Sequence, residues 1–221
     1  MHVPESTSPR ASERRRSTRP LGGTPGNDGF VDSKFNKKVF KLLPGDYFVT
    51  RRDEILTTVL GSCISACIRD PVIGVGGMNH FMLPNSTLDS GAWTGGASNS
   101  NRYGAYAMES LINSLMKFGA QRSRFEVKLF GGAAVIPGMS DVGARNIEFV
   151  RRFLAVEGLP VVAENVGDRT PRRINYFPRT GEVLMRKLRL ISGESVAARE
   201  KDYLKALTTE PVAGDIELFG D

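Results

Sequence analysis

The fold of this chain is decided by residues 57–84, which read TTVLGSCISACIRDPVIGVGGMNHFMLP. Ile64–Ile68 is a short apolar run, and a second apolar run, interrupted by glycines, covers 73–82. Runs of this length and composition are typical of buried strands. Pro71 comes directly after an aspartate and is followed by Gly74, a combination that favours a turn. We therefore predict an antiparallel hairpin as the central element.

A turn centred between Pro71 and Val72 places Cys63 directly opposite His80 on the neighbouring strand. In a regular pair the two Cβ atoms would be about 5 Å apart, close enough for a thiol and an imidazole to interact. A slip by one residue, or a bulge at the glycine pair 76–77, would change the partner. The register is therefore a hypothesis.

Cys63 and His80 are the residue types of a thiol nucleophile and its base. His80 is the only histidine outside the first 30 residues, and Gly61 and Ser62 precede the cysteine where a strand gives way to flexible backbone. We expect the backbone N–H groups there to lower the pKa of the thiol and to hold an oxyanion. The competing interpretation is structural, because cysteine is a common core residue, and Cys67 fits that role.

The composition suits one globular domain with irregular ends, since 40% of the 221 residues are hydrophobic. We predict a disordered basic arm at 1–30, a single catalytic domain at 31–191 and a loosely attached extension at 192–221. Two cysteines give neither a disulfide framework nor a zinc site. No apolar run approaches the roughly 20 residues of a membrane helix. These features predict a cytoplasmic protein without membrane insertion.

The net charge of +6 raises the question of a nucleic-acid partner. The basic residues are spread along the chain and do not form one stripe. One group lies in the predicted arm, a second flanks the first strands, and a third comprises Arg169, Arg172, Arg173, Arg179, Arg186, Lys187 and Arg189. Two interpretations stay open, solvated strand faces or a docking surface for an acidic partner, and nucleic-acid binding is not predicted.

The rest of the chain reads as a mixture of strands and helices. Strands are predicted at 37–43, 47–50, 55–60, 126–130, 160–165, 173–177 and 182–190. Helices are predicted at 102–118 and 142–157, with a weak helix at 196–207. The loop at 85–101 carries the only tryptophan and could be a lid or a mobile excursion. Glycines 131–132 allow another backbone or a substrate to approach closely.

Other cysteine chemistries lack the residues that they need. Cys63 and Arg69 have the spacing of a cysteine phosphatase, but an apolar strand separates them where a glycine-rich phosphate cradle is required. Cys63 and Cys67 are one residue too far apart for the redox motif Cys-x-x-Cys. No glycine-rich nucleotide-binding motif opens a helix.

Several segments resemble the CheD family, the chemoreceptor glutamine deamidases of bacterial and archaeal chemotaxis. They are TTVLGSC, the following Asp-Pro, GGMNHFMLP, RYGAYAMESLINSLMKFGA, KLFGGAAV, VGARNIEFV and RTGEVLMRKL, and they extend over about residues 38–190. In that family a cysteine, a histidine and a threonine of the first motifs are catalytic. The resemblance carries these roles to Cys63, His80 and Thr57, with the Thr57 hydroxyl orienting the imidazole and with Gly61 and Ser62 supplying oxyanion donors.

The resemblance implies an α/β (α+β) fold, a three-layer sandwich of mixed or antiparallel sheets with helices packed on one side, similar to the cysteine deamidase domains of certain bacterial toxins. It implies hydrolysis of protein glutamine side chains to glutamate without metal or cofactor, and for some members hydrolysis of glutamate methyl esters. The implied partners are the cytoplasmic helices of chemoreceptors and the CheC phosphatase. A non-catalytic adaptor that binds the same partners is the alternative, and an unrelated nucleic-acid binder ranks third.

Overall fold

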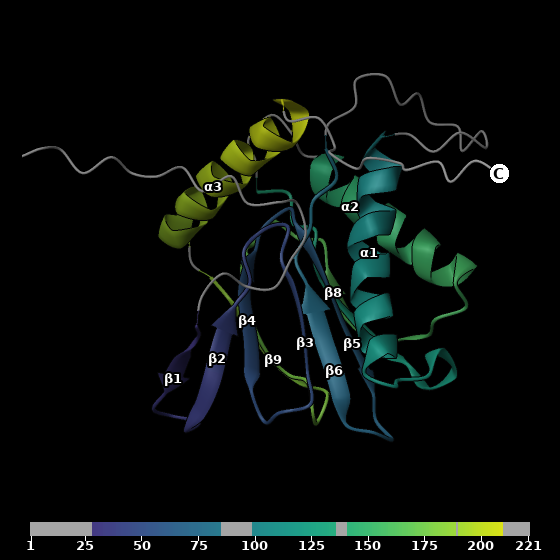
Figure 1. Cartoon of the computed structure of the whole chain (residues 1–221). Coiled ribbons are helices and arrows are strands. Elements are labelled where there is room, and N and C mark those ends of the chain that lie inside the picture. The colour runs from purple at the N-terminus through teal and green to yellow at the C-terminus, as the bar shows by residue number, and fades with distance from the viewer. Residues whose placement is uncertain (1–27, 85–98, 136–140, 189, 210–221) are drawn as a thin grey trace, which may run out of the picture.

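The computed structural model describes residues 28–84, 99–135, 141–188 and 190–209. They form two mixed five-stranded sheets that pack face to face, with helices against one sheet and across one end (Figure 1). Most of the predicted arm and most of the predicted loop at 85–101 lie outside the described residues. The α+β class with two sheets and packed helices is confirmed.

The first sheet has the order β1-β2-β4-β9-β10. Its strands are β1 (Phe30–Asp32), β2 (Lys37–Lys41), β4 (Ile55–Leu60), β9 (Arg172–Phe177) and β10 (Glu182–Lys187). Strands β2 and β4 are parallel, and the other neighbours are antiparallel. The sequence predicted all of these strands except β1, which is short and largely exposed.

The second sheet has the order β3-β6-β5-β7-β8. Its strands are β3 (Tyr47–Thr50), β6 (Val75–Asn79), β5 (Ile64–Asp70), β7 (Glu126–Gly131) and β8 (Val161–Val166). Strand β5 lies in the middle and is buried on both faces. This double burial explains the nearly continuous apolar run of its sequence.

The hairpin β5–β6 forms, but its register differs from the predicted one. Cys67 pairs with Met78, and Ile64 bridges to Phe81, so the turn is centred one residue later, between Val72 and Ile73. The shift moves the partner of Cys63 by two positions, and this even number leaves Cys63 and His80 on the same face. The two residues are diagonal neighbours instead of a direct pair.

Helices α1 (Asn99–Lys117) and α2 (Asp141–Val156) cover the outer face of the second sheet (Figure 1). Between them and β7 lies a short 3-10 helix, η1 (Arg122–Arg124). Both long helices were predicted to within a few residues. Each is followed by a glycine with positive φ, Gly119 at 87° and Gly158 at 66°, as expected for a helix C-terminus.

Helix α3 (Leu190–Thr209) lies across one end of the two sheets (Figure 1). The sequence predicted a weaker, loosely attached helix at this place. Three of its apolar side chains are buried, with Leu204 in the core between the sheets, Leu207 in the core under α1 and α2, and Val196 as the third. These side chains attach the described part of the extension to the rest of the fold.

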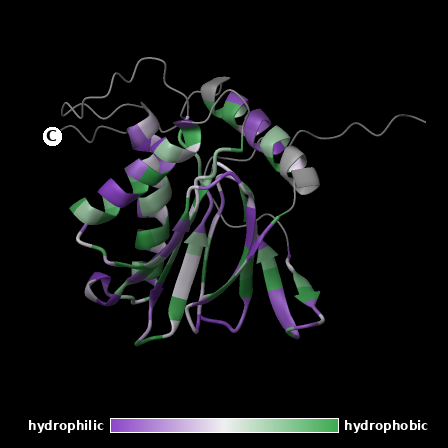
Figure 2. Cartoon of the chain, turned by 180° about the vertical axis from the view of Figure 1, so that it is seen from behind, coloured by the Kyte–Doolittle hydropathy of each residue, from purple (hydrophilic) through white to green (hydrophobic). Residues whose placement is uncertain are grey.

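The core between the sheets contains side chains from both of them, including Leu56 and Tyr176 from the first and Cys67 and Met78 from the second. Hydrophobic and hydrophilic residues are interspersed along the strands and helices, as expected when each element buries one face (Figure 2). Cys63 belongs to the same core and lies at its end, where β4 leads into β5 under α3.

Candidate active site

The loop of Gly61, Ser62 and Cys63 between β4 and β5 is held through its three carbonyl oxygens. They accept hydrogen bonds of 2.7 Å from the Ala133 N–H, the Asn146 side-chain amide and the Gly132 N–H, in that order. Asn146 is fully buried on α2, and its own oxygen accepts the Leu83 N–H at 2.9 Å. With every carbonyl of the loop bound on one side, its N–H groups are free to converge on the other.

Those N–H groups converge on the carboxylate of Glu200, which belongs to α3. Glu200 accepts from Gly61 N at 2.8 Å, from Ser62 N at 2.7 Å and from Cys63 N at 3.2 Å. The Ser62 hydroxyl donates a further bond of 2.7 Å. The side chain is only 3% exposed. The backbone donors that the sequence analysis assigned to an oxyanion are thus occupied by a carboxylate of the same chain.

Two glycines make this arrangement possible. A Cβ at Gly61 would lie 2.6 Å from the Glu200 Oε2 atom and 2.5 Å from a methyl group of Val135. At Gly131, where φ is 112°, a Cβ would lie 2.1 Å from the Cys63 carbonyl oxygen. Of the two uses proposed for glycines 131–132, the structure shows close approach of another backbone.

Cys63 and His80 come together under α3. Three polar atoms lie within 4.8 Å of one another: the sulfur of Cys63, a ring nitrogen of His80 and a carboxylate oxygen of Glu200. Cys63 is completely buried, and His80 is 3% exposed. The predicted proximity of thiol and imidazole is therefore present, although the strand register that suggested it is not.

The protonation of the imidazole follows from its neighbour Thr58. The Thr58 hydroxyl donates its proton to the Leu42 carbonyl at 2.8 Å, and its oxygen lies 2.8 Å from Nδ1 of His80. A hydroxyl has one proton, so Nδ1 must be the donor to Thr58. Nε2 has no hydrogen-bond partner among the described residues. The neutral ring therefore presents a bare Nε2 that can accept a proton.

Thr57, which the resemblance assigned to this role, does not contact His80. Its hydroxyl contacts the Ile174 carbonyl at 2.9 Å and the Asn175 side chain at 2.7 Å. Side chains alternate along β4, so Thr57 and Thr58 lie on opposite faces of the first sheet. The predicted contact between Thr57 and the imidazole is wrong in this structure, and the adjacent threonine makes it.

Burial is the main cause that raises the pKa of Cys63 well above its usual value, and the Glu200 carboxylate raises it further. Burial also lowers the pKa of His80 to about 4, although Glu200 acts in the opposite direction. The pair is therefore a neutral thiol and a neutral imidazole at neutral pH. The expectation of a lowered thiol pKa is wrong for this state, because the N–H groups bind Glu200.

The described residues contain one group of three side chains that could together bind a metal ion, and it consists of Cys63, His80 and Glu200. The Glu200 carboxylate is already bound by three N–H groups and one hydroxyl. A metal ion would have to compete with those donors. The arrangement is that of an occupied anion site.

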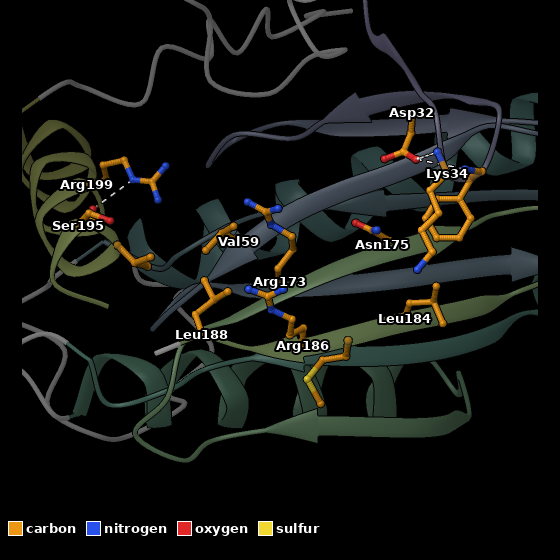
Figure 3. Close-up of a pocket in the computed structure, with 13 residues that line it drawn as sticks. Asp32, Lys34, Val59, Arg173, Asn175, Leu184, Arg186, Leu188, Ser195 and Arg199 are labelled. Atoms are coloured by element: carbon orange, nitrogen blue, oxygen red, sulfur yellow. Dashed lines mark hydrogen bonds between the residues drawn. The ribbon is translucent and has the colours of Figure 1, made fainter. Parts of the chain in front are cut away.

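A groove of about 580 Å³ lies between the exposed face of the first sheet and α3 (Figure 3). Cys63, His80 and Glu200 do not line it, and α3 is the element that the groove shares with the site. Its lining includes four cationic side chains, Lys34, Arg173, Arg186 and Arg199, and one acidic side chain, Asp32. Arg172, which the sequence analysis grouped with these cations, is fully buried, and its guanidinium is bound by the carbonyl oxygens of Asn165 and Gly167. The exposed cluster is therefore smaller than predicted.

The sequence did not predict three residues of the site, although one sequence pattern marks all three. Thr58, Asn146 and Glu200 are polar residues at positions where the period of the element calls for an apolar one. Thr58 alternates with Leu56 and Leu60, Asn146 lies between Val142 and Val150, and Glu200 lies between Val196 and Leu204. A polar residue on a buried face needs a partner, which makes such positions candidates for a site.

None of the described helices combines the length and the apolar character that crossing a bilayer requires.

Residues 82–187 match the CheD family, described as CheD chemotactic sensory transduction. The chain is 52% identical over 192 residues to a protein of Herminiimonas arsenicoxydans named probable chemoreceptor glutamine deamidase CheD, covering 86% of this chain and 93% of that protein. A protein of the same name from Saccharophagus degradans is 52% identical over 193 residues, covering 86% and 88%. One from Hahella chejuensis is 52% identical over 179 residues, covering 81% and 84%.

Among solved structures, the chain resembles the Bacillus licheniformis hypothetical protein YfiH. The sequence identity is 13%, the TM-score is 0.36, and the match covers 65% of this chain and 62% of that one. A likeness of this degree carries no argument about function.

Proposed function

Because this chain belongs to the CheD family, we propose that it hydrolyses glutamine side chains of chemoreceptors to glutamate and ammonia, with Cys63 as the nucleophile. The relatives carry the name of this activity. The observation that supports the mechanism is the buried thiol beside an imidazole, next to backbone N–H groups that bind a side-chain carboxylate.

In the first half of the reaction, the Cys63 sulfur attacks the carboxamide carbon of the substrate while its proton passes to Nε2 of His80. The carbonyl oxygen becomes an oxyanion, which the N–H groups of Gly61 and Cys63 stabilise. The imidazolium then returns the proton to the nitrogen of the carboxamide as the C–N bond breaks. Ammonia leaves, and a thioester remains on Cys63.

In the second half, water attacks the thioester carbon, and Nε2 of His80 accepts a proton from that water. The C–S bond breaks, and the imidazolium returns its proton to the sulfur. The carboxylic acid that forms loses its remaining proton to solvent, and the product is a glutamate carboxylate lying against the N–H groups. Thr58 does not react in either half, but it holds the imidazole in the tautomer that both halves require.

We propose that the partner docks on the cationic groove, which shares α3 with the site. Chemoreceptor segments with Glu and Gln at their modification sites are acidic, and Arg173 and Arg186 are exposed on the groove. Complementary charge of this kind acts mainly on the rate of association. The CheC phosphatase is a second proposed partner, for which the same exposed surface is available.

The experiment incubates the chain with a purified receptor cytoplasmic domain and detects conversion of Gln to Glu by peptide mass, together with released ammonia. We expect conversion with the natural chain and with Cys67→Ala, and none with Cys63→Ala or His80→Ala. Cys67 is the matched control, because it is equally buried but pairs with Met78 in the core. Receptor binding without ammonia release would identify an adaptor. Activity in Cys63→Ala would overturn the assignment.

A further inference from the structure

We propose that α3 occupies the substrate site of this enzyme, with the Glu200 carboxylate in the place of the product carboxylate, so that receptor segments and α3 compete for one position. The inference rests on the proposed function, because it identifies the Glu200 site with the site of that reaction. It adds an internal competitor and a binding mode for the substrate.

The identity of the side chain is the first argument. A deamidase acting on glutamine releases a glutamate side chain, and the group bound by the loop at 61–63 is a glutamate side chain. Both carboxylate oxygens of Glu200 accept N–H donors of the loop. The second oxygen also accepts the Ser62 hydroxyl. The loop is therefore complementary to a carboxylate at the distance from Cys63 where the reaction would form one.

Burial is the second argument. Cys63 has no exposed surface while α3 is in place, and a glutamine on another protein cannot reach a thiol that is covered. The Nε2 atom of His80 is also buried and has no hydrogen-bond partner within the described chain. A complete pair of reacting groups is thus present but closed to other molecules. Catalysis on a receptor requires Glu200 and the helix that carries it to move away.

The way in which α3 is held makes such movement possible without unfolding the sheets. Its polar attachments include Glu200 and the Tyr203 hydroxyl, which lies 2.5 Å from the hydroxyl of Tyr103 on α1. Its apolar attachments include Val196, Leu204 and Leu207. All five lie on α3, which is not part of either sheet, so the departure of the helix leaves the hydrogen bonds between the strands intact. The Glu200 contacts are charge-assisted and therefore contribute strongly to this attachment.

The contacts of α3 also indicate how the substrate binds. Glu200 projects from one face of a helix, between buried apolar residues one turn away on each side, Val196 and Leu204. A segment that displaces α3 fits the same space if it is a helix with Gln or Glu flanked by apolar residues at a spacing of four. The proposed substrate is therefore a helical segment that presents its glutamine as α3 presents Glu200.

The test uses the full chain with Glu200→Ala and Glu200→Leu, and Asp202→Ala as the control. Leucine fills a similar volume but accepts no hydrogen bond, so it separates loss of the carboxylate from loss of packing. Asp202 is an exposed acidic residue on the same helix. The first measurement is the rate at which iodoacetamide alkylates Cys63 without receptor, read by peptide mass. The second is kcat/KM for receptor deamidation, with thermal unfolding as the check of folding.

In both Glu200 variants we expect iodoacetamide to alkylate Cys63 about tenfold faster or more, because the charge-assisted hydrogen bonds that hold α3 in place are lost. Both variants should also show a lower KM for the receptor. Asp202→Ala should match the natural chain. The inference is overturned if folded Glu200 variants alkylate at the natural rate, or if their deamidation falls, because Glu200 would then assist the reaction. If the Glu200 variants are alkylated faster but neither they nor the natural chain deamidates a receptor, α3 covers the thiol in the natural chain, but the proposed function is wrong. If the natural chain deamidates receptors but the Glu200 variants do not differ from it in either measurement, the proposed function holds and the inference about α3 is wrong.

Discussion

The Thr58 hydroxyl and Nδ1 of His80 lie 2.8 Å apart, and this contact fixes which imidazole nitrogen is available to the Cys63 thiol. Thr58 donates to the Leu42 carbonyl and therefore accepts from His80. A serine protease uses an aspartate for the same purpose, which adds a charge that stabilises the imidazolium. With a neutral threonine in its place, the ring is oriented but stays a weak base.

Thr58→Val should therefore lower kcat for receptor deamidation by about 10–100-fold, a smaller loss than removal of a charged orienter causes. Thr57→Val is the matched control, because it makes the same chemical change one residue away, on the opposite face of β4. We expect it to retain most of the activity. The measurement is kcat across a pH series for both variants. Loss of activity in Thr57→Val with normal turnover in Thr58→Val would restore the role that the family resemblance assigned to Thr57.

Asn146→Leu should weaken both the fold and the reaction. The substitution leaves the Ser62 carbonyl and the Leu83 N–H without their buried partner, and each such group costs about 1–3 kcal/mol. The loop at 61–63 would also lose the anchor that aims its N–H groups. Urea unfolding and kcat are the measurements, with the exposed Glu148→Ala on the same helix as the control. A variant as stable and active as the natural chain would show that Gly132 and Ala133 hold the loop alone.

Arg173→Glu should slow association with the receptor by several-fold at low salt, and the difference should shrink at moderate salt. Arg173 is exposed on the groove beside α3. Arg179→Glu makes the same change at an exposed residue outside the groove and serves as the control. Equal association rates for the two variants would mean that the cationic residues of the groove are only a solvated strand face.

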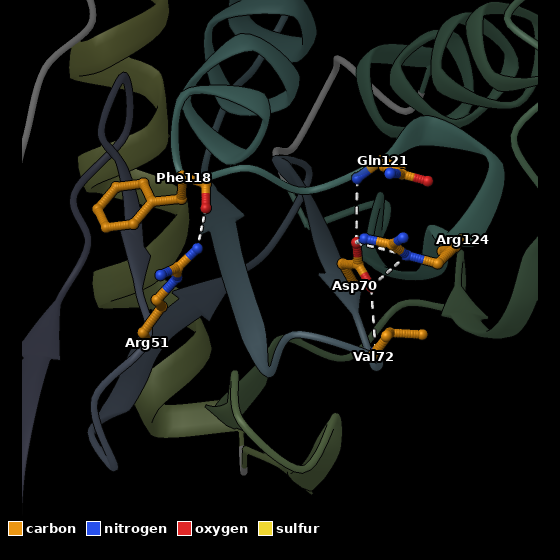
Figure 4. Close-up of polar contacts among 6 residues, drawn as sticks. All are labelled: Arg51, Asp70, Val72, Phe118, Gln121 and Arg124. Atoms are coloured by element: carbon orange, nitrogen blue, oxygen red, sulfur yellow. Dashed lines mark hydrogen bonds and ion pairs between the residues drawn. The ribbon is translucent and has the colours of Figure 1, made fainter.

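Asp70→Asn should destabilise the chain at neutral pH and have little effect in acid. Asp70 lies at the end of β5, where its carboxylate accepts the Gln121 and Val72 N–H groups and pairs with the Arg124 guanidinium (Figure 4). Burial alone would raise its pKa, but these partners outweigh burial and lower the pKa to about 2.

The lowered pKa of Asp70 determines how the stability of the fold changes with pH. A carboxylate with a folded pKa below the unfolded value of 3.8 stabilises the fold above that pH, and the stabilisation is lost as the pH falls toward about 2. The difference corresponds to about 2 kcal/mol at neutral pH. Unfolding by urea at pH 7 and pH 2.5 should show a large gap between Asp70→Asn and the natural chain at the first pH and a small one at the second. A gap of the same size at both would assign the effect to packing. The same figure shows Arg51 donating a hydrogen bond to the Phe118 carbonyl.

The fold could be predicted largely because its signals are local. Alternation and apolar runs indicated the strands except β1, and the glycines at 119 and 158 marked the ends of two helices. The hairpin register could not be predicted, because Pro71 is compatible with more than one turn length. The structure settles it through Gly74, whose φ of 63° closes the longer turn, and through the Asp70 side chain.

The site was predictable in part. Cys63 and His80 stood out as rare, reactive residue types, and Gly61 and Ser62 as flexible backbone before the cysteine. The choice between Thr57 and Thr58 as the partner of His80 required only the alternation of side chains along β4. Leu56 and Leu60 mark its buried face, and Thr58 lies on the same face between them. Glu200 could not be connected to the loop at 61–63, because contacts between residues so distant in sequence have no periodic signal.

The contact between Glu200 and the loop at 61–63 implies that the enzyme could modify its own residue 200. In a chain with Glu200→Gln, the carboxamide would lie at the position that we assign to the substrate, held there by its own helix. Cys63 could then convert it, and the protein would correct one of its own residues back to glutamate without any change in its gene. Peptide mass of the freshly made and aged variant checks this, with Cys63→Ala in the same background as the control. If the introduced carboxamide persists in a chain that still modifies receptors, the helix presents this side chain out of reach of the sulfur.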